Sequence, residues 1–359
     1  MPTLFDPVRL GAVEAPNRII MAPLTRARAT RQHVPTAIMA DYYRQRAGAG
    51  LIITEATGIS QQGLGWPFAP GIWSPEQVEA WKPVTEAVHA AGGRIFVQLW
   101  HMGRVVHPSF LNGAQPVSAS ATTAPGLAHT YDGKQPYAEA RPLEIAEIPA
   151  LLDDYARGAR NAVAAGFDGV QLHAANGYLI DQFLRDGSNR RDDDYGGSAE
   201  NRVRLLKEVT RTLVEEIGAG RTAVRLSPNG DTQGVDDSNP AEVFGLAADA
   251  LDALGIAFLE LREQKPHGTF GASDVPRQSP LIRQRFGGPL VLNSDYDKAE
   301  AEAEIASGHA DAISFGRPFI GNPDLPLRLA NGAPLVETDM THWYSNGPEG
   351  YSDYPALAA

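Results

Sequence analysis

Eight short apolar runs, rich in Val, Ile, Leu and Phe, recur along the chain and alternate with longer segments of helical pattern. Apolar runs of this length, set between helical patterns, are typical of buried strands. Their alternation with helices predicts βαβ units and therefore a parallel sheet. The runs are Arg18–Ala22, Gly50–Thr54, Arg94–Leu99, Phe167–Leu172, Thr222–Leu226, Ala257–Leu261, Pro289–Leu292 and Ala312–Phe315.

The segments between the runs carry helical patterns that stop at glycine. Four times the chain places a helical segment, a glycine and then an apolar run, at Gly166, Gly218, Gly255 and Gly308. Right-handed crossovers of this kind build an open doubly wound sheet or a closed barrel, and eight units favour the barrel. We therefore predict an α/β fold, a (β/α)8 TIM barrel, with residues 1–359 as a single domain. The expected helices are Trp81–Ala91, Ile148–Ala165, Ser198–Ile217, Pro240–Leu254 and Lys298–Ser307.

The chain is longer than a barrel requires. A minimal barrel needs roughly 250 residues, whereas this chain has 359. The largest excursion extends from about His101 to Arg141, follows the third run and is rich in Pro, Gly, Ser and Ala. We expect it to cap the active-site mouth. The C-terminal extension from Asn331, which contains Trp343 and Tyr344, is expected to form a second flap or a packed tail.

Charge and composition exclude several functions. The formal net charge is −12 and the pI is about 5.2, so nucleic acid and anionic membrane surfaces are not expected partners. The absence of cysteine excludes disulfides, thiolate zinc sites, a catalytic thiol and cysteine-held iron–sulfur clusters. There is no secretory-signal pattern and no apolar run that could span a bilayer. We expect a cytoplasmic monomer or weak homodimer that acts on a small molecule.

Polar residues at the carboxyl end of the fourth run are the main indication of chemistry, because catalytic side chains of barrels lie there. His173 ends the run, and Asn176 and Tyr178 follow on one tight turn. Two hydrogen-bond donors three positions apart can converge on one carbonyl oxygen, and tyrosine, with an unperturbed pKa of roughly 10, can donate a proton. This combination suits reduction of an activated alkene, or enolate chemistry. His101 and His173 lack a third ligand, so we expect no metal.

The other strand ends suit a flavin. Gln98 can pair with the pyrimidine edge through its amide, and Thr25 can donate to a ring atom. Arg225 can hold the negative charge of a reduced flavin. Asn293, followed by Gly316-Arg317 after the eighth run, matches the phosphate site expected at that place in a barrel.

With these residues assembled, the sequence resembles the Old Yellow Enzyme family of FMN-dependent ene-reductases, over essentially the whole chain. It is most similar to the classical branch that contains bacterial 2-cyclohexenone and N-ethylmaleimide reductases. Thr25 stands where another bacterial subgroup has cysteine. The matching motifs are Asn17-Arg18-Ile19, Met21 to Arg26, Glu55-Ala56-Thr57, Gln98 to Arg104, Phe167 to Leu179, Asp193 to Ser198, Glu200-Asn201-Arg202, Arg225 to Pro228, and Phe315 to Pro318.

The resemblance implies a role for each matching residue. His173 and Asn176 would bind the substrate carbonyl, and Tyr178 would protonate the α-carbon after hydride transfer from flavin N5 to the β-carbon. Trp100 and Tyr344 would line the substrate pocket. The FMN-binding set would be Pro23, Leu24, Thr25, Ala56, Gln98, Arg225, Asn293, Gly316 and Arg317.

The resemblance also implies the overall reaction. NADPH or NADH would reduce FMN and leave, and the alkene would then enter the same pocket in a ping-pong mechanism. Expected substrates are enones, enals, maleimides and nitroalkenes. Two alternatives remain open: a phosphate-binding aldolase or isomerase, which would need a lysine or carboxylate at the mouth, and a non-catalytic flavin carrier, which would not need Tyr178.

Several other polar residues are expected to be structural. Glu55 and Glu260 are as consistent with partners of arginine as with catalysis. Asp181 and Arg185, one helical turn apart, are expected to form a surface pair. The acidic run Asp192–Asp194 is expected to be a solvated loop or a helix cap. His101 is ambiguous between a place beside the flavin and simple packing.

Overall fold

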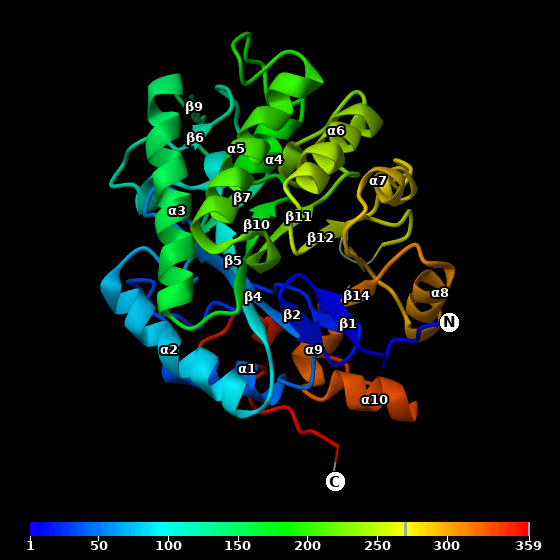
Figure 1. Ribbon diagram of the computed structural model, residues 1–359. Coiled ribbons are helices and arrows are strands. Elements are labelled where there is room, and N and C mark those ends of the chain that lie inside the picture. The colour runs from blue at the N-terminus through cyan, green and yellow to red at the C-terminus, as the bar shows by residue number, and fades with distance from the viewer. Residues whose placement is uncertain (269–270, 358–359) are drawn as a thin grey trace.

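In the computed structural model, which describes residues 1–268 and 271–357, eight parallel strands close into a barrel (Figure 1). Each predicted run overlaps one of them, so the (β/α)8 fold is confirmed. Neighbouring strands pair in parallel around the whole circle, in the order of the chain. The strands are β3 Ile19–Met21, β4 Leu51–Gly58, β5 Ile95–Trp100, β10 Gly169–Ala174, β11 Thr222–Leu226, β12 Phe258–Arg262, β13 Leu290–Asn293 and β14 Ala312–Phe315.

Helices surround the barrel. All five predicted helices are present, and α2 begins six residues earlier than Trp81, because Ser74 caps its first turn by accepting from the backbone N–H of Gln77 (3.2 Å). The outer helices are α1 Ala37–Gln45, α2 Pro75–Ala90, α3 Ile148–Ala164, α5 Ala199–Ile217, α6 Pro240–Ala253, α7 Ser279–Arg285 and α8 Lys298–Ser307. Shorter helices are α4 Leu179–Leu184, α9 Pro318–Gly321 and α10 Leu325–Asn331.

Two apolar layers hold this arrangement together. One fills the space between strands and helices, and the other fills the barrel interior with side chains such as Phe96 and Phe258, whose rings lie 5.8 Å apart. The hairpin β1 Val8–Leu10 with β2 Val13–Ala15 joins the interior layer and closes the amino-terminal end of the barrel. The chemistry must therefore lie at the opposite, carboxyl end.

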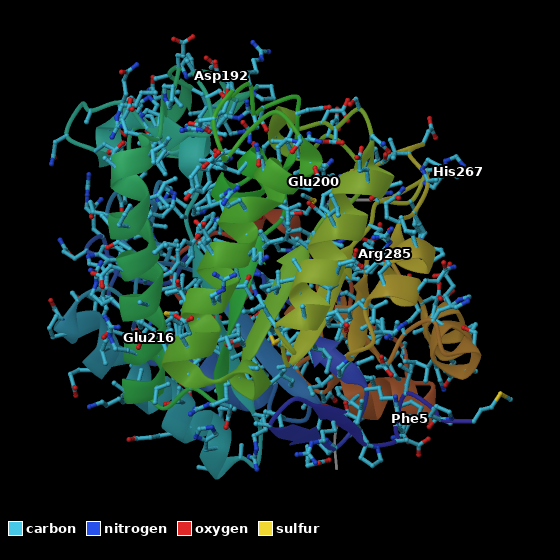
Figure 2. The ribbon with its side chains drawn as sticks, turned by 45° about the horizontal axis from the view of Figure 1, so that its top comes forward. Phe5, Asp192, Glu200, Glu216, His267 and Arg285 are labelled. Atoms are coloured by element: carbon cyan, nitrogen blue, oxygen red, sulfur yellow. The ribbon has the colours of Figure 1, made fainter. Side chains whose placement is uncertain are left out.

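The carboxyl end can be followed in Figure 2. Helix α5 runs from the labelled Glu200 to Glu216, and the loop that contains Asp192 lies beyond its first residue. Phe5, next to the closing hairpin, lies on the opposite side of the molecule from Asp192. The segment between β10 and α5, which contains Asp192, therefore lies on the side of the molecule away from Phe5.

The predicted excursion after the third barrel strand consists of short elements. It contains the two-residue strands β6 Val117–Ser118 and β9 Arg141–Pro142, which pair in parallel, and a hairpin of β7 Leu127–Thr130 and β8 Gly133–Pro136. The Trp66 ring lies 4.7 Å from the His129 ring of this hairpin and 5.7 Å from the ring of Tyr344. The excursion and the C-terminal tail therefore meet through Trp66.

The C-terminal extension is a packed tail. Arg26 Nε and Arg28 NH1 both donate to the carbonyl oxygen of Trp343, at 3.0 and 2.7 Å. The ring of Tyr351 stacks on that of Tyr42, with centroids 4.1 Å apart. Residues directly after β3 thus fix the tail that carries Tyr344. No helix in the described part of the chain is long and apolar enough to cross a membrane.

Candidate functional site

A cavity of about 760 Å³ opens at the carboxyl ends of the barrel strands. Every residue that the sequence predicted for the site lines this cavity. They come from seven of the eight barrel strands or the segments that follow them, all but β12, except Tyr344, which the tail supplies. The predicted residues are Pro23, Leu24, Thr25, Ala56, Gln98, Trp100, His173, Asn176, Tyr178, Arg225, Asn293, Gly316, Arg317 and Tyr344.

The turn between β10 and α4 has a backbone that restricts its sequence. Asn176 has φ 59° and Gly177 has φ 75°, in the left-handed region that asparagine and glycine tolerate best. A Cβ atom at Gly177 would lie 2.4 Å from the carbonyl oxygen of Thr232. Glycine is therefore required at residue 177, and the tight turn presents Asn176 and Tyr178 to the same cavity.

Asp181 and Arg185 form a buried ion pair, so the expectation of a surface pair was wrong. Their side chains are 0% and 2% exposed, and Arg185 Nε lies 3.0 Å from Asp181 Oδ1. The reason is that every residue of the short helix α4 is buried beneath the loops. Asp181 Oδ2 also accepts from the backbone N–H of Gly177 (2.9 Å) and from Ser227 Oγ (3.2 Å), and Ser227 Oγ accepts from the N–H of Asn176 (2.7 Å). The pair thus supports the turn that carries the site.

His173 and Tyr178 have the protonation states that the predicted chemistry needs. Burial, with the charges of Arg225 and Arg262, holds the pKa of His173 well below its usual value, so the imidazole is neutral. Burial, with Tyr137 and Tyr344 nearby, raises the pKa of Tyr178, so its hydroxyl stays protonated. Among the described residues, His173 Nδ1 has no hydrogen-bond partner.

The aromatic rings of the site pack edge to face. The Tyr178 ring lies 4.8 Å from the His173 ring and 5.0 Å from the Trp100 ring, at interplanar angles of 80° and 84°. These contacts limit rotation of the tyrosine. Its hydroxyl and the imidazole are therefore held on one wall of the cavity.

Arg262 contributes to the site in a way that sequence reasoning missed. It lies at the end of β12, and its NH1 donates to Asn176 Oδ1 and to Thr232 Oγ1, both at 3.1 Å. Because Oδ1 is engaged, the Asn176 amide keeps its N–H groups available as donors. Its strand-end position was the available signal, but nothing in the sequence indicated that it would meet Asn176.

The loops after β11 and β12 add further lining residues that the sequence did not indicate. Thr232, Gln233 and Gln264 line the cavity. These residues lie in irregular segments where no periodicity distinguishes an inward side chain from an outward one. Only the path of the loops brings them to the mouth.

A buried polar network joins the residues that were predicted to bind the flavin ring. Gln98 Nε2 donates to Gln171 Oε1 (2.8 Å), and Gln171 Nε2 donates to Glu260 Oε2 (2.7 Å). Arg225 NH1 lies 3.2 Å from Glu260 Oε1, and Arg225 NH2 donates to Asn293 Oδ1 (2.8 Å). Of the two roles expected for Glu260, a partner of arginine or a catalytic acid, the structure shows the first.

Glu55 has a different partner from the one expected. It accepts from the backbone N–H groups of Arg26 and Ala27, both at 3.1 Å, and from the hydroxyl of Tyr43 (3.3 Å). The carboxylate is fully buried and fixes the segment directly after Thr25. Its contact with Arg26 is with the main chain and not with the guanidinium.

The proposed phosphate end is formed by the segments that follow β13 and β14. Gly316 and Arg317 follow β14, and Arg317 NH2 forms a short ion pair with Asp295 in the loop after β13. Asp295 has φ 47° and Ser294 has φ 131°. A Cβ atom at Gly316 would lie 3.3 Å from the Leu24 side chain, so glycine keeps this backbone close to the cavity.

The residues present fit an FMN. Arg225 lines the cavity, its Nε has no hydrogen-bond partner among the described residues, and its NH1 has only the ion pair with Glu260, although buried donors normally have a hydrogen-bond partner. A planar polar ligand beside Arg225 and Gln98 would satisfy them. A phosphate would meet Arg317 at the other end. No group of three potential metal ligands occurs in residues 1–268 or 271–357.

His101 is a packing residue in this structure. It is fully buried and does not line the cavity. Its Nδ1 accepts from the backbone N–H of Gly103 (3.1 Å), and burial lowers its pKa to about 3. Asp193 pairs with Arg191 in a loop that precedes α5, which agrees with the expectation of a loop for the acidic run.

A closed barrel with these residues at its mouth is the architecture of a flavin-dependent barrel oxidoreductase. Residues 3–335 match the NADH:flavin oxidoreductase / NADH oxidase family. The chain belongs to this family, and its structural neighbours are Old Yellow Enzyme homologues. It is an NAD(P)H-dependent flavin oxidoreductase that acts on C=C bonds.

Solved structures and curated proteins agree on this assignment. An Old Yellow Enzyme homologue from Zymomonas mobilis is 64% identical, with a TM-score of 0.98 over 99% of this chain and 100% of that one. Morphinone reductase in complex with tetrahydroNAD is 45% identical, with a TM-score of 0.94 over 100% and 98%. Chanoclavine-I aldehyde reductase from Penicillium roqueforti is 44% identical over 99% of this chain and 96% of its own length.

Proposed function

We propose that this protein reduces the C=C bond of α,β-unsaturated carbonyl compounds (enones, enals and maleimides) and of nitroalkenes, with NADPH or NADH as reductant, in a ping-pong reaction. One observation carries the proposal. A neutral imidazole, an amide oriented by Arg262 and a protonated phenol face one cavity with Gln98 and Arg225. Relatives whose names describe reductases of morphinone and 12-oxophytodienoate support it.

The substrate-facing residues have three different roles: carbonyl binding, protonation and shaping of the pocket. His173 and Asn176 donate hydrogen bonds to the carbonyl oxygen, where negative charge grows in the transition state. One such donor is typically worth about 2.7–4 kcal/mol of barrier. Bound FMN supplies the hydride that adds to the β-carbon. Tyr178 gives its hydroxyl proton to the α-carbon, and Trp100 and Tyr344 shape the pocket around the alkene.

The remaining lining residues hold the cofactor. Gln98 and Arg225 would bind the pyrimidine end of the ring, Thr25 would donate to the flavin ring, and Gly316 with Arg317 would bind the phosphate. Arg317 would then give up part of its contact with Asp295 in order to bind the phosphate. Pro23, Leu24, Ala56 and Asn293 complete the set by lining the same cavity.

The first experiment uses colour and half-reactions. Purified protein should be yellow with bound FMN, should bleach anaerobically with NADPH or NADH, and should regain its colour on addition of 2-cyclohexen-1-one. Comparing the two nicotinamides gives the preferred reductant. A colourless protein that binds no added FMN would contradict the proposal.

The second experiment separates the proton donor from the rest of the site. Tyr178→Phe should retain FMN and its rate of reduction by nicotinamide, but should slow reoxidation by the enone at least tenfold, because no hydroxyl faces the α-carbon. Tyr354→Phe, in the C-terminal tail, is the matched control and should leave both rates unchanged. If Tyr178→Phe reoxidises as fast as the parent, another group supplies the proton.

A further inference from the structure

Glu260 is a fully buried carboxylate that the proposed reaction does not use. It lies in β12, and three side chains from other barrel strands contact it. Ser314 Oγ donates to Oε1 (2.5 Å), Gln171 Nε2 donates to Oε2 (2.7 Å), and Arg225 NH1 lies 3.2 Å from Oε1. A buried carboxylate is stable only with such partners. The carboxylate is therefore a fixed negative charge within the barrel wall.

The first consequence concerns the amide of Gln98. A carboxylate only accepts hydrogen bonds, so Gln171 must turn its Nε2 toward Glu260. Gln171 Oε1 then accepts from Gln98 Nε2 at 2.8 Å. Gln98 is left with its Oε1 and one N–H for the cavity. The charge on Glu260 thus decides which way the Gln98 amide presents its donor and acceptor.

The second consequence concerns the charge on Arg225. Arg225 and Glu260 are paired residues on the adjacent strands β11 and β12, so the sheet register itself holds them together. The carboxylate offsets part of the guanidinium charge. The field that Arg225 exerts on a ligand in the cavity is weaker than that of an uncompensated arginine.

We propose that Glu260 is a positioning residue with two effects. Through Gln171 it orients the Gln98 amide that binds FMN, and by partly neutralising Arg225 it makes the midpoint potential of bound FMN more negative than it would be without this carboxylate. A more negative potential makes the reduced flavin a stronger hydride donor. This inference rests on the proposed placement of the pyrimidine ring beside Gln98 and Arg225.

The test is the midpoint potential of FMN-loaded Glu260→Gln, measured by anaerobic dye equilibration at pH 7. The substitution is close to isosteric but removes the charge, and it turns an amide N–H toward Ser314, Gln171 or Arg225. We expect the ratio of reduced to oxidised flavin at a fixed potential to rise at least tenfold. For a two-electron couple this is a shift of about 30 mV to more positive potential.

Two further variants separate the two consequences. Ser314→Ala keeps the charge on Glu260 and removes one hydrogen bond. The midpoint potential of its bound FMN should therefore differ from that of the parent by less than a third of the shift expected for Glu260→Gln. Gln171→Met leaves Glu260 beside Arg225 but disconnects Gln98, so FMN should dissociate several-fold more readily while the potential changes little. FMN affinity is read from the recovery of flavin fluorescence on dilution.

The outcomes distinguish this inference from the proposed function. If the parent protein binds no FMN, the proposed function fails. If it binds FMN and Glu260→Gln has an unchanged potential, the role of Glu260 is overturned. Should Glu260→Gln not fold, Glu260→Asp takes its place, because its shorter side chain retracts from Arg225 and should shift the potential in the same direction. An unchanged potential there overturns the inference equally.

Discussion

Arg262 NH1 donates to Asn176 Oδ1 across the mouth of the barrel, at 3.1 Å, between two strand ends that are 86 residues apart in the chain. The guanidinium is buried, and burial lowers its pKa to about 10, so it stays cationic at neutral pH. A cation beside Oδ1 fixes the amide in the orientation that keeps its N–H groups available as donors. The donor strength of Asn176 therefore depends on Arg262.

Replacing Arg262 by methionine should weaken substrate binding more than it slows turnover. Without the guanidinium the Asn176 amide can rotate, so we expect KM for an enone to rise about tenfold, the worth of roughly one hydrogen bond to a charged group. Steady-state kinetics with 2-cyclohexen-1-one measures this. Arg262→Lys should recover part of the loss, and Arg211→Met, at an exposed position on α5, is the control. An unchanged KM would contradict the role of Arg262.

His173→Ala should abolish the binding of phenols, which mimic the substrate carbonyl oxygen. The neutral imidazole is a donor for an anionic oxygen, and alanine has no donor. The measurement is the long-wavelength charge-transfer band that forms when a phenol is titrated into the oxidised protein; we expect it to disappear at concentrations that saturate the parent. His267→Ala, at an exposed loop position labelled in Figure 2, should retain the band.

Asp181→Ala should destabilise the protein strongly. Arg185 would then be a buried cation with only main-chain acceptors at Ser227 and Gly230, and breaking such a pair costs about 3–5 kcal/mol of unfolding free energy. Urea denaturation followed by circular dichroism measures it. Glu79→Gln, which removes an exposed ion pair with Lys82, should cost less than about 1 kcal/mol. Equal effects of the two substitutions would argue against the buried pair.

Stability should fall as the pH is lowered below about 6.5. The folded-state pKa of His101 is about 3, below the value of the unfolded chain, so the unfolded state binds the proton first. From His101 alone we expect a loss of about 2 kcal/mol between pH 7 and pH 5. His101→Gln should remove that part of the pH dependence in urea denaturation. If the free energy of unfolding fell equally steeply with pH in the parent and in His101→Gln, His101 would be protonated in the folded state.

Much of the architecture could be predicted because each helix and strand depends on its own local sequence pattern. The apolar run Thr222–Leu226 coincides with β11, and the helical pattern Lys298–Ser307 coincides with α8, since each depends on its own spacing of apolar residues and on glycine or capping residues at its ends. Helix α2 begins six residues before the predicted Trp81, because Ser74 caps its first turn. The site residues at strand ends followed from the position of catalytic groups in barrels and from the family resemblance.

The sequence by itself therefore determined the barrel, the segment His173–Tyr178 and fourteen of the residues that surround the cavity. The tertiary structure decided which side chains meet: Arg262 with Asn176, Glu260 with Arg225, and Asp181 with Arg185 in the interior instead of at the surface. Such contacts depend on the relative register of separate strands and on how deeply α4 is covered. Hydrophobic periodicity reports burial within one element and carries no information on the partner that a polar group finds in another.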